Sequence, residues 1–239
     1  MQNRQYNVQQ NSKGMIARGS ATAPISASAT KVLRNTYTLL AMTLIFSAVM
    51  AAVSMSIGLS RGASLVCSLG ALALVWLVLP RTANSSAGIG VVFAFTGLLG
   101  LSLGPILMHY LQFANGGQII MQALGGTGLV FFALSGYVLT TKKDFSFMRG
   151  MLVAGLVVVL VAALGSIVAS MFGVEITAIS LAISAAIVFL MSGFILYDTS
   201  RIVNGGETNY IMATTGLYLN IYNLFVSLLH LIGAFSGND

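Results

Sequence analysis

The 239-residue chain is too apolar for a soluble protein: 57% of its residues are hydrophobic and only 7% are charged, whereas a soluble domain carries about 25% charged residues. Its long apolar stretches are instead expected to lie in a lipid bilayer as helices, whose backbone groups form their hydrogen bonds internally. The net charge of +6 does not indicate a nucleic-acid partner, because the bases lie at the ends of apolar runs and in the N-terminal segment rather than on one face.

The first 35 residues are predicted to be a disordered, basic, cytoplasmic tail. Residues 1–35 are rich in Asn, Gln, Ser and Ala, and they contain five bases and no acid, which is typical of segments that do not fold alone. An organellar transit peptide is the less favoured alternative, because the segment shows no convincing amphipathic period. Residues 36–239 are predicted to form one transmembrane domain.

Seven apolar runs follow the tail, and each is predicted to cross the membrane as a helix. Each run reaches or approaches the roughly 20 residues that a helix needs to cross the hydrocarbon core. Glycines, a proline and charged residues separate the runs, as expected of turns. The runs cover residues 36–59, 63–79, 87–111, 119–140, 151–172, 176–197 and 210–235.

The distribution of bases predicts the orientation of the spans. With seven spans, ten of the eleven Lys and Arg residues fall on the side of the N-terminal tail, and Arg61 alone falls on the other side. Because basic residues accumulate in cytoplasmic segments, we expect the N-terminus in the cytoplasm and the C-terminus outside. The bases that follow the tail on this side are Arg81, Lys142, Lys143, Arg149 and Arg201.

Small residues in the third run predict a close contact between helices. Gly100 and Gly104 form a G-x-x-x-G pattern, and in lipid such patterns allow two helix backbones to approach closely. Tight packing of the bundle is the favoured interpretation of this pattern.

Asp198 is the acid that most strongly indicates a functional site. Apolar residues flank it, and the helix is expected to continue to a stop at Gly205 and Gly206, which places the carboxylate about two turns inside the helix end. An ionisable group within a span is costly and is by default functional. The alternative is a local ion pair with Arg201, three residues further along the same helix.

Polar residues line one face of the seventh span. Their spacings are four, three, four and three, which corresponds to one face of a helix. Hydrogen bonding to neighbouring helices would explain the face, and a water-lined path that includes Asn220 and Asn223 is the alternative. The residues of this face are Gly216, Asn220, Asn223, Ser227 and His230.

No constellation of residues supports catalysis. The sequence lacks the H-E-x-x-H motif of zinc proteases, and its serines do not lie in a G-x-S-x-G elbow. Asp198 lacks the second facing carboxylate that an aspartyl protease requires. We therefore expect a protein that is not an enzyme, with no catalytic residue, no bound metal and no cofactor.

Several motifs resemble the Bax inhibitor-1 family, and within it the bacterial YccA-like branch. The resemblance covers essentially the whole chain after the tail. It is carried by Lys31-Val-Leu-Arg-Asn-Thr-Tyr37, Phe93-Ala-Phe-Thr-Gly97, Leu103-Gly-Pro-Ile-Leu107, Ala123-Leu-Gly-Gly-Thr127, Tyr137-Val-Leu-Thr-Thr-Lys-Lys-Asp-Phe-Ser-Phe147, Ile195-Leu-Tyr-Asp-Thr199, Gly205-Gly-Glu-Thr-Asn-Tyr210 and Leu217-Tyr-Leu-Asn-Ile-Tyr-Asn-Leu-Phe225.

The resemblance implies an all-α membrane fold in which six helices surround a central seventh. It also implies a pH-sensitive calcium leak or, for the YccA-like branch, an inner-membrane partner of the ATP-dependent protease FtsH. In channel-like relatives, aspartates on spans six and seven share a proton, and an arginine on span two latches to them. Asp198 matches the first aspartate, Asn220 stands at the place of the second, and Arg81 lies near the place of the arginine. An amide cannot share a proton as a carboxylate does.

Three hypotheses of function follow from these residues and from the resemblance. The first is a multi-pass inner-membrane regulator that binds an FtsH-like protease through its helix faces and its tail. The second is a leak pathway for calcium or protons, in which Asp198 is the gate and Asn220, Asn223, Arg81 and Arg201 line or flank the route. A secondary transporter is the third and least favoured, because no internal repeat or matched helix interruption is evident.

Overall fold

The computed structural model describes residues 25–236, and in this range the protein is all-helical, with seven helical segments long and apolar enough to span a membrane. Each segment overlaps one of the seven predicted runs, which confirms the prediction of an all-helical protein with seven candidate spans. The helices are α2 (Ala27–Ser56), α3 (Arg61–Ala73) with α4 (Leu79–Thr82), α5 (Ala87–Tyr110), α6 (Gly116–Thr141), α7 (Arg149–Met171), α8 (Thr177–Val203) and α9 (Tyr210–Ser236).

Helix α2 begins at Ala27, well before the predicted first run at residue 36. The hydroxyl of Ser26 accepts a hydrogen bond from the Ala29 N–H at 3.2 Å, and such a cap satisfies an unpaired donor at the helix start. The predicted boundary between tail and transmembrane domain therefore falls inside a helix. Residues 1–24 of the predicted tail lie outside the described range.

The second span continues through Pro80, where the sequence predicts a loop. A π-helical turn at Leu74–Val78 joins α3 to α4, and the Leu79 N–H bonds to the Leu74 carbonyl oxygen, five residues back. Pro80 lacks an N–H and would interrupt a regular helical ladder, and a widened turn ahead of it accommodates this break. Arg81 consequently lies in the last turn of a helix.

The predicted stop after the sixth span is confirmed. Helix α8 ends at Val203, and Gly205 has a φ of 76°, the left-handed conformation that glycine adopts without strain. The Gly206 N–H donates to the Arg201 carbonyl oxygen at 2.8 Å, which satisfies one of the unpaired carbonyls at the helix end. Asp198 therefore lies five residues before the last helical residue of α8.

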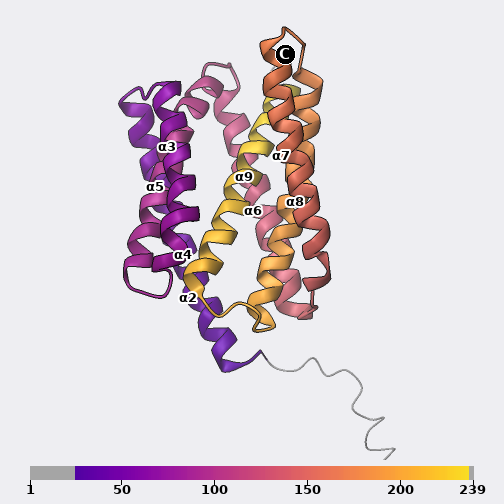
Figure 1. The fold of residues 1–239 in the computed structure, drawn as a ribbon. Helices are drawn as coiled ribbons and strands as arrows, with labels where there is room; N and C mark the ends of the chain where they lie inside the picture. The colour runs from indigo at the N-terminus through magenta and orange to yellow at the C-terminus, as the bar shows by residue number, and fades with distance from the viewer. Residues whose placement is uncertain (1–24, 237–239) are drawn as a thin grey trace, which may run out of the picture.

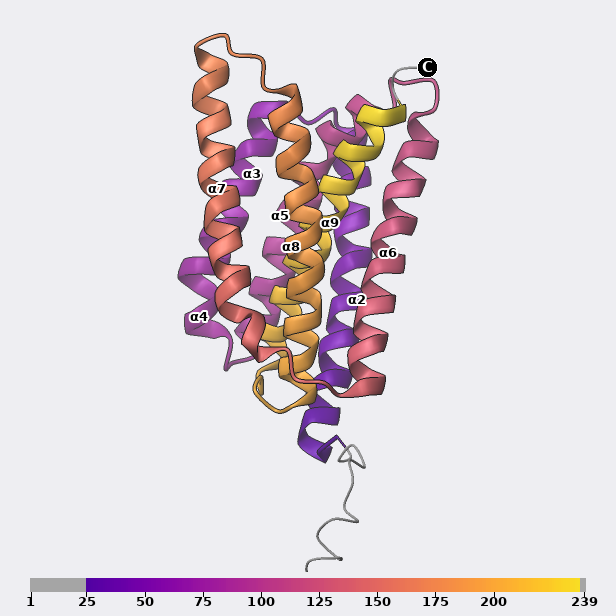
Figure 2. The same ribbon diagram turned by 90° about the vertical axis from the view of Figure 1, so that its right-hand side faces the viewer.

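Helix α9 lies among the other helices and carries much of the buried surface. It packs against α2, α5, α6 and α8, whereas α3 packs on α5 and α7 packs on α8 at the periphery (Figures 1 and 2). Both clusters of buried apolar side chains include residues of α9. The start of α2 and the end of α9 lie at opposite ends of the bundle (Figure 2), as an odd number of spans requires.

Glycines of α5 allow a close approach of α2, which confirms the predicted tight packing. A Cβ atom at Gly100 would overlap the Ser47 carbonyl oxygen and lie 2.9 Å from the Ser47 hydroxyl, and one at Gly104 would overlap the Ser54 side chain. These contacts leave no room for a side chain at either position. Because α2 and α5 lie so close together here, the Ser54 hydroxyl on α2 can donate to the Leu101 carbonyl oxygen on α5 at 2.7 Å.

Candidate functional site

Asp198 on α8 and Asn220 on α9 form a direct polar contact between two spans. The Asn220 side-chain amide donates to a carboxylate oxygen of Asp198 at 2.7 Å. Asn220 is buried and Asp198 is half-buried. A Cβ atom at Gly216, one turn before Asn220, would lie 3.1 Å from the same carboxylate oxygen. Because Gly216 has no side chain, the Asp198 carboxylate can pack closely against α9 at this point.

Arg201 does not form the local ion pair with Asp198 that the sequence offered as an alternative. Its guanidinium bonds to the Glu207 carboxylate at 3.0 Å, beyond the end of α8, and it also donates to the Gly206 carbonyl oxygen at 3.3 Å. The guanidinium carbon lies 5.6 Å from the centre of the Tyr197 ring, a cation-π distance. Arg201 thus fastens the loop between α8 and α9 to the end of α8.

The structure does not bring Arg81 or Asn223 to the carboxylate of Asp198. Arg81 is exposed and donates to the Leu77 carbonyl oxygen within its own helical segment. The Asn223 amide donates to the Leu219 carbonyl oxygen, one turn back on α9, at 2.8 Å. Of the five residues singled out from the sequence, only Asp198 and Asn220 are joined by a hydrogen bond within residues 25–236.

Further hydrogen bonds connect the polar face of α9 to α8. The Nδ1 atom of His230 and the hydroxyl of Ser184 on α8 share a hydrogen bond of 2.8 Å. Two residues of the predicted face, Asn220 and His230, therefore bond to α8. This supports interhelical hydrogen bonding as an explanation of the face. The two contacts lie nearly three turns apart along α9, because His230 follows Asn220 by ten residues.

Sequence reasoning missed two tyrosines that join α9 to the α2 and α5 side of the bundle. The Tyr218 hydroxyl lies 2.6 Å from the Ser47 hydroxyl on α2, and the Tyr222 hydroxyl lies 2.9 Å from the Ser102 hydroxyl on α5. Tyrosines four residues apart share a helix face, which was a usable signal. Their serine partners lie far away in sequence, and no pattern within α9 identifies them.

The loop between α6 and α7 is held against the end of α8. The Ser200 hydroxyl accepts a hydrogen bond from the Phe145 N–H at 2.9 Å and donates to the Lys143 carbonyl oxygen at 3.2 Å. Within the loop, Asp144 accepts hydrogen bonds from the backbone N–H and the hydroxyl of Ser146 at 2.8 and 2.9 Å. These bonds favour the carboxylate and lower the pKa of Asp144 below its usual value.

The described residues include no ready-made metal centre. Across residues 25–236, no group of three or more His, Cys, Asp or Glu side chains comes together as a metal site would require. The polar pair of Asp198 and Asn220 offers one carboxylate and one amide, whereas a calcium site in proteins takes six to eight oxygen ligands. The pair can hold or exchange a proton, and it can present one carboxylate to a passing cation.

Comparisons with known proteins agree with one another over nearly the whole chain. The family model described as "Inhibitor of apoptosis-promoting Bax1" matches residues 29–237. A relative from Vibrio cholerae serotype O1, described as an uncharacterized membrane protein, is 53% identical over 209 residues, which is 87% of this chain and 92% of the relative.

Two relatives from Escherichia coli have more informative descriptions. The protein of strain K12 is described as "Modulator of FtsH protease YccA", and that of strain CFT073 as "Inner membrane protein YccA". Each is 51% identical to this chain over 209 residues, which is 87% of this chain and 92% of the relative.

Proposed function

The chain belongs to the Bax inhibitor-1 family, and from this premise we propose that it modulates a membrane-anchored, ATP-dependent protease of the FtsH type. It is a multi-pass inner-membrane protein, and its role is regulatory rather than enzymatic. The observation that carries the proposal is the 51% identity to the Escherichia coli modulator of FtsH protease, which extends over 92% of that relative. The family model matches residues 29–237, which include nearly all of α2 and all of the later spans.

The proposed orientation places the start of α2 in the cytoplasm and the end of α9 outside. Ten of the eleven bases then lie on the cytoplasmic side. We further propose that α9 is the central helix and that the other six surround it, an arrangement supported by the packing of α9 against four of them. Residues 1–35 supply a basic cytoplasmic segment for contacts with the protease.

Exposed helix faces supply the surface on which a membrane partner would bind. Helix α7 packs on α8 and exposes most of its apolar side chains, among them Val158, Leu164 and Met171. In lipid, helices associate through van der Waals packing and hydrogen bonds rather than through the hydrophobic effect. A lipid-facing helix with few internal neighbours is therefore well placed to pack against a span of the protease.

Co-purification and substrate turnover test the proposal. The full chain, purified from native membranes, should bring the FtsH-type protease with it, and its overexpression should slow the turnover of a membrane substrate of that protease. A variant without residues 2–24 is the matched control for the tail, because it retains every helix found in residues 25–236. We expect it to enter the membrane and to modulate the protease less. Absence of the protease from repeated purifications, together with unchanged substrate turnover, would reject the proposal.

A second candidate function is a leak pathway for calcium or protons in which Asp198 is the gate. It is favoured by the half-buried carboxylate of Asp198, which lies inside a span and accepts a hydrogen bond from the amide of Asn220, since ionisable groups in spans usually serve transport or gating. Liposomes that contain the purified protein and a calcium dye would test it. Asp198→Asn should reduce the flux, and an unchanged flux and pH dependence would rule out this mechanism.

A further inference from the structure

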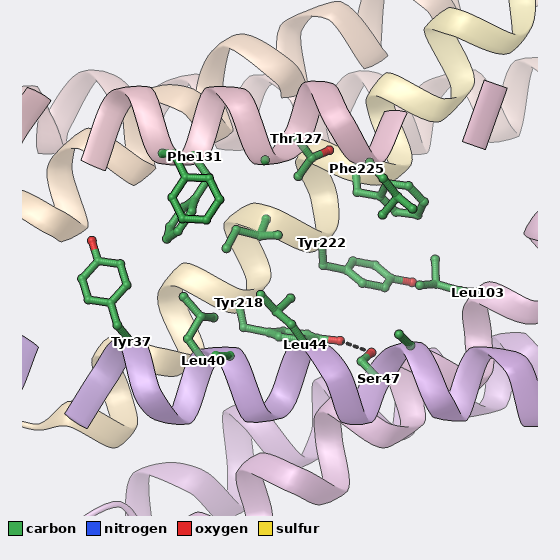
Figure 3. Close-up of a pocket in the computed structure, with 16 residues that line it drawn as sticks. Tyr37, Leu40, Leu44, Ser47, Leu103, Thr127, Phe131, Tyr218, Tyr222 and Phe225 are labelled. Atoms are coloured by element: carbon green, nitrogen blue, oxygen red, sulfur yellow. Dashed lines mark hydrogen bonds between the residues drawn. The ribbon is translucent and has the colours of Figure 1, made fainter. Parts of the chain in front are cut away.

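A cavity of about 520 Å³ lies between α2 and α6, and α9 forms its floor (Figure 3). Its wall is almost entirely carbon, with side chains such as Leu40, Leu44 and Phe131 turned toward it. Of the hydroxyl groups in the wall, only that of Tyr37 lacks a partner in the described chain. The Ser47 hydroxyl bonds to Tyr218, and the Thr127 hydroxyl donates to a backbone carbonyl oxygen of α6. Water needs two to four polar partners to occupy such a space, so this cavity does not suit water.

The cavity opens sideways, toward the surface that lipid covers. Its rim consists of exposed residues, Ala41 and Ala48 on α2 and Leu124 and Phe132 on α6. Both helices pack on α9. The small alanine side chains leave the gap between α2 and α6 open, and the bilayer is what lies outside it. An apolar space in contact with hydrocarbon can be filled by lipid without loss of hydrogen bonds.

The end of the cavity near the start of α2 carries positive charge. Arg34, Ala41 and Ala48 recur every seven residues and so lie nearly on one line along α2, which places Arg34 just beyond the opening. Lys31 lies one turn before Arg34, and both side chains are exposed and take part in no salt bridge within residues 25–236. The α6–α7 loop at the same end of the bundle (Figure 2) contributes two lysines and one aspartate.

The size of the cavity argues against a helix as its occupant. A helix with its side chains is about 11 Å across and rises about 5.4 Å per turn, so one turn alone encloses about 510 Å³. The whole cavity would therefore hold a single turn of a partner helix. An acyl chain is a single file of methylene groups and can enter between α2 and α6 along its length.

We propose that this cavity holds one acyl chain of an anionic phospholipid from the leaflet around the start of α2, with the lipid phosphate beside Arg34 and Lys31. The cavity supplies the apolar contacts, and the bases select the headgroup, because Lys and Arg at a membrane surface attract anionic lipids. The Tyr37 hydroxyl, at this end of the cavity, is buried without a hydrogen-bond partner in the described chain. A bound ester group would give this hydroxyl a partner. The proposal does not depend on the protease or on Asp198.

Photo-crosslinking with a defined lipid tests the proposal. The full chain is reconstituted into phosphatidylcholine vesicles that contain phosphatidylglycerol with a photoreactive group in its acyl chain. Labelling should concentrate on residues 37–48 and 124–132 and should be weaker on the lipid-facing helix α7. Equal labelling of α7 and the cavity segments would overturn the proposal. Crosslinks from residues 37–48 to a second protein chain in place of lipid would also overturn it.

A matched pair of variants distinguishes the cavity from the general lipid-facing surface. Gly128 lines the cavity, Gly165 lies exposed on α7, and a Cβ atom at either position would have open space around it. Gly128→Phe should therefore fill the cavity and reduce labelling of residues 37–48 to less than half, whereas Gly165→Phe should leave it unchanged. If Gly128→Phe fails to accumulate in the membrane, Ala41→Phe replaces it in the test. This substitution closes the opening from the α2 side, and we expect the same reduction in the labelling of residues 37–48. Unchanged labelling in either cavity variant contradicts the proposal.

The charge of the headgroup is tested separately. Each of the substitutions Arg34→Gln and Lys31→Gln should lower the preference for phosphatidylglycerol over phosphatidylcholine by about fivefold, the effect of one base near an anionic headgroup. Labelling by photoreactive phosphatidylcholine, measured in parallel, should change little. An undiminished preference in the double variant would overturn the assignment of the headgroup to these bases.

Discussion

Replacement of Gly100 by alanine should destabilise the bundle, because α2 and α5 meet there without space for a methyl group. The added Cβ atom would overlap the Ser47 carbonyl oxygen and lie 3.0 Å from the Met50 Cβ atom. The first of these neighbours belongs to the backbone and cannot rotate away, so α2 itself has to shift. The shift would also disturb the Ser47 hydroxyl, which donates to the Thr96 carbonyl oxygen at 3.0 Å and bonds to Tyr218 at 2.6 Å.

The expected loss of stability follows from three contributions. Overpacking of a filled interface costs about 1–3 kcal/mol, and a weakened hydrogen bond costs about 1 kcal/mol. Replacement of glycine by alanine in a helix returns about 1 kcal/mol. We therefore expect Gly100→Ala to lower the free energy of unfolding by about 2 kcal/mol.

Unfolding by sodium dodecyl sulfate, followed by far-ultraviolet circular dichroism in mixed micelles, would measure this loss. Gly90→Ala is the matched control, since Gly90 lies on the same helix and a Cβ atom there has no neighbour within 4 Å. The control should be as stable as the wild type or up to about 1 kcal/mol more stable. If both variants unfold at the same detergent fraction, the close approach of α2 and α5 does not limit stability, and the reasoning is wrong.

Three further predictions concern polar groups. Asn220→Ala should lower the free energy of unfolding by about 1–2 kcal/mol, because it removes the hydrogen bond to Asp198. In a double-mutant cycle, Asn220→Ala should cost much less when it is made in a chain that already carries Asp198→Asn. Arg201→Gln should cost at most about 1 kcal/mol in detergent unfolding, because its ion pair with Glu207 is part-exposed. Asp144 has a lowered pKa in the folded protein, so its carboxylate stabilises the fold above its unfolded pKa of about 3.9, and this stabilisation is lost as the pH falls below that value. When the free energy of unfolding is measured at decreasing pH, Asp144→Asn should therefore lose less stability than the wild type. Identical pH profiles of the two proteins would contradict this role of Asp144.

The contact between Asp198 and Asn220 gives the second candidate function a specific consequence. Where two carboxylates face each other, they can share one proton, and the loss of that proton makes them repel. Here the facing group is an amide, whose N–H donates to the carboxylate at 2.7 Å. A proton-dependent rearrangement at this site would therefore have to rest on Asp198 alone, and Asn220→Asp is the substitution that would introduce the second acid.

Hydropathy was sufficient to predict the seven spans, because a bilayer accepts only long apolar helices with satisfied backbones. The turns were also predictable, as Gly205 illustrates, since its positive φ suits glycine. The start of α2 at Ala27 could not be predicted in this way, because hydropathy identifies only the apolar part of a helix and does not detect a polar extension capped by Ser26.

The sequence by itself also determined that Gly216, Asn220 and His230 share one face of α9, because the period of a helix follows from local geometry alone. Only the tertiary structure decided what that face meets. It set Asn220 rather than Arg201 against Asp198, bonded Tyr218 to Ser47, and left an open cavity between α2 and α6. These outcomes depend on how far apart whole helices stand, and that separation is set by side chains from distant parts of the chain packing together.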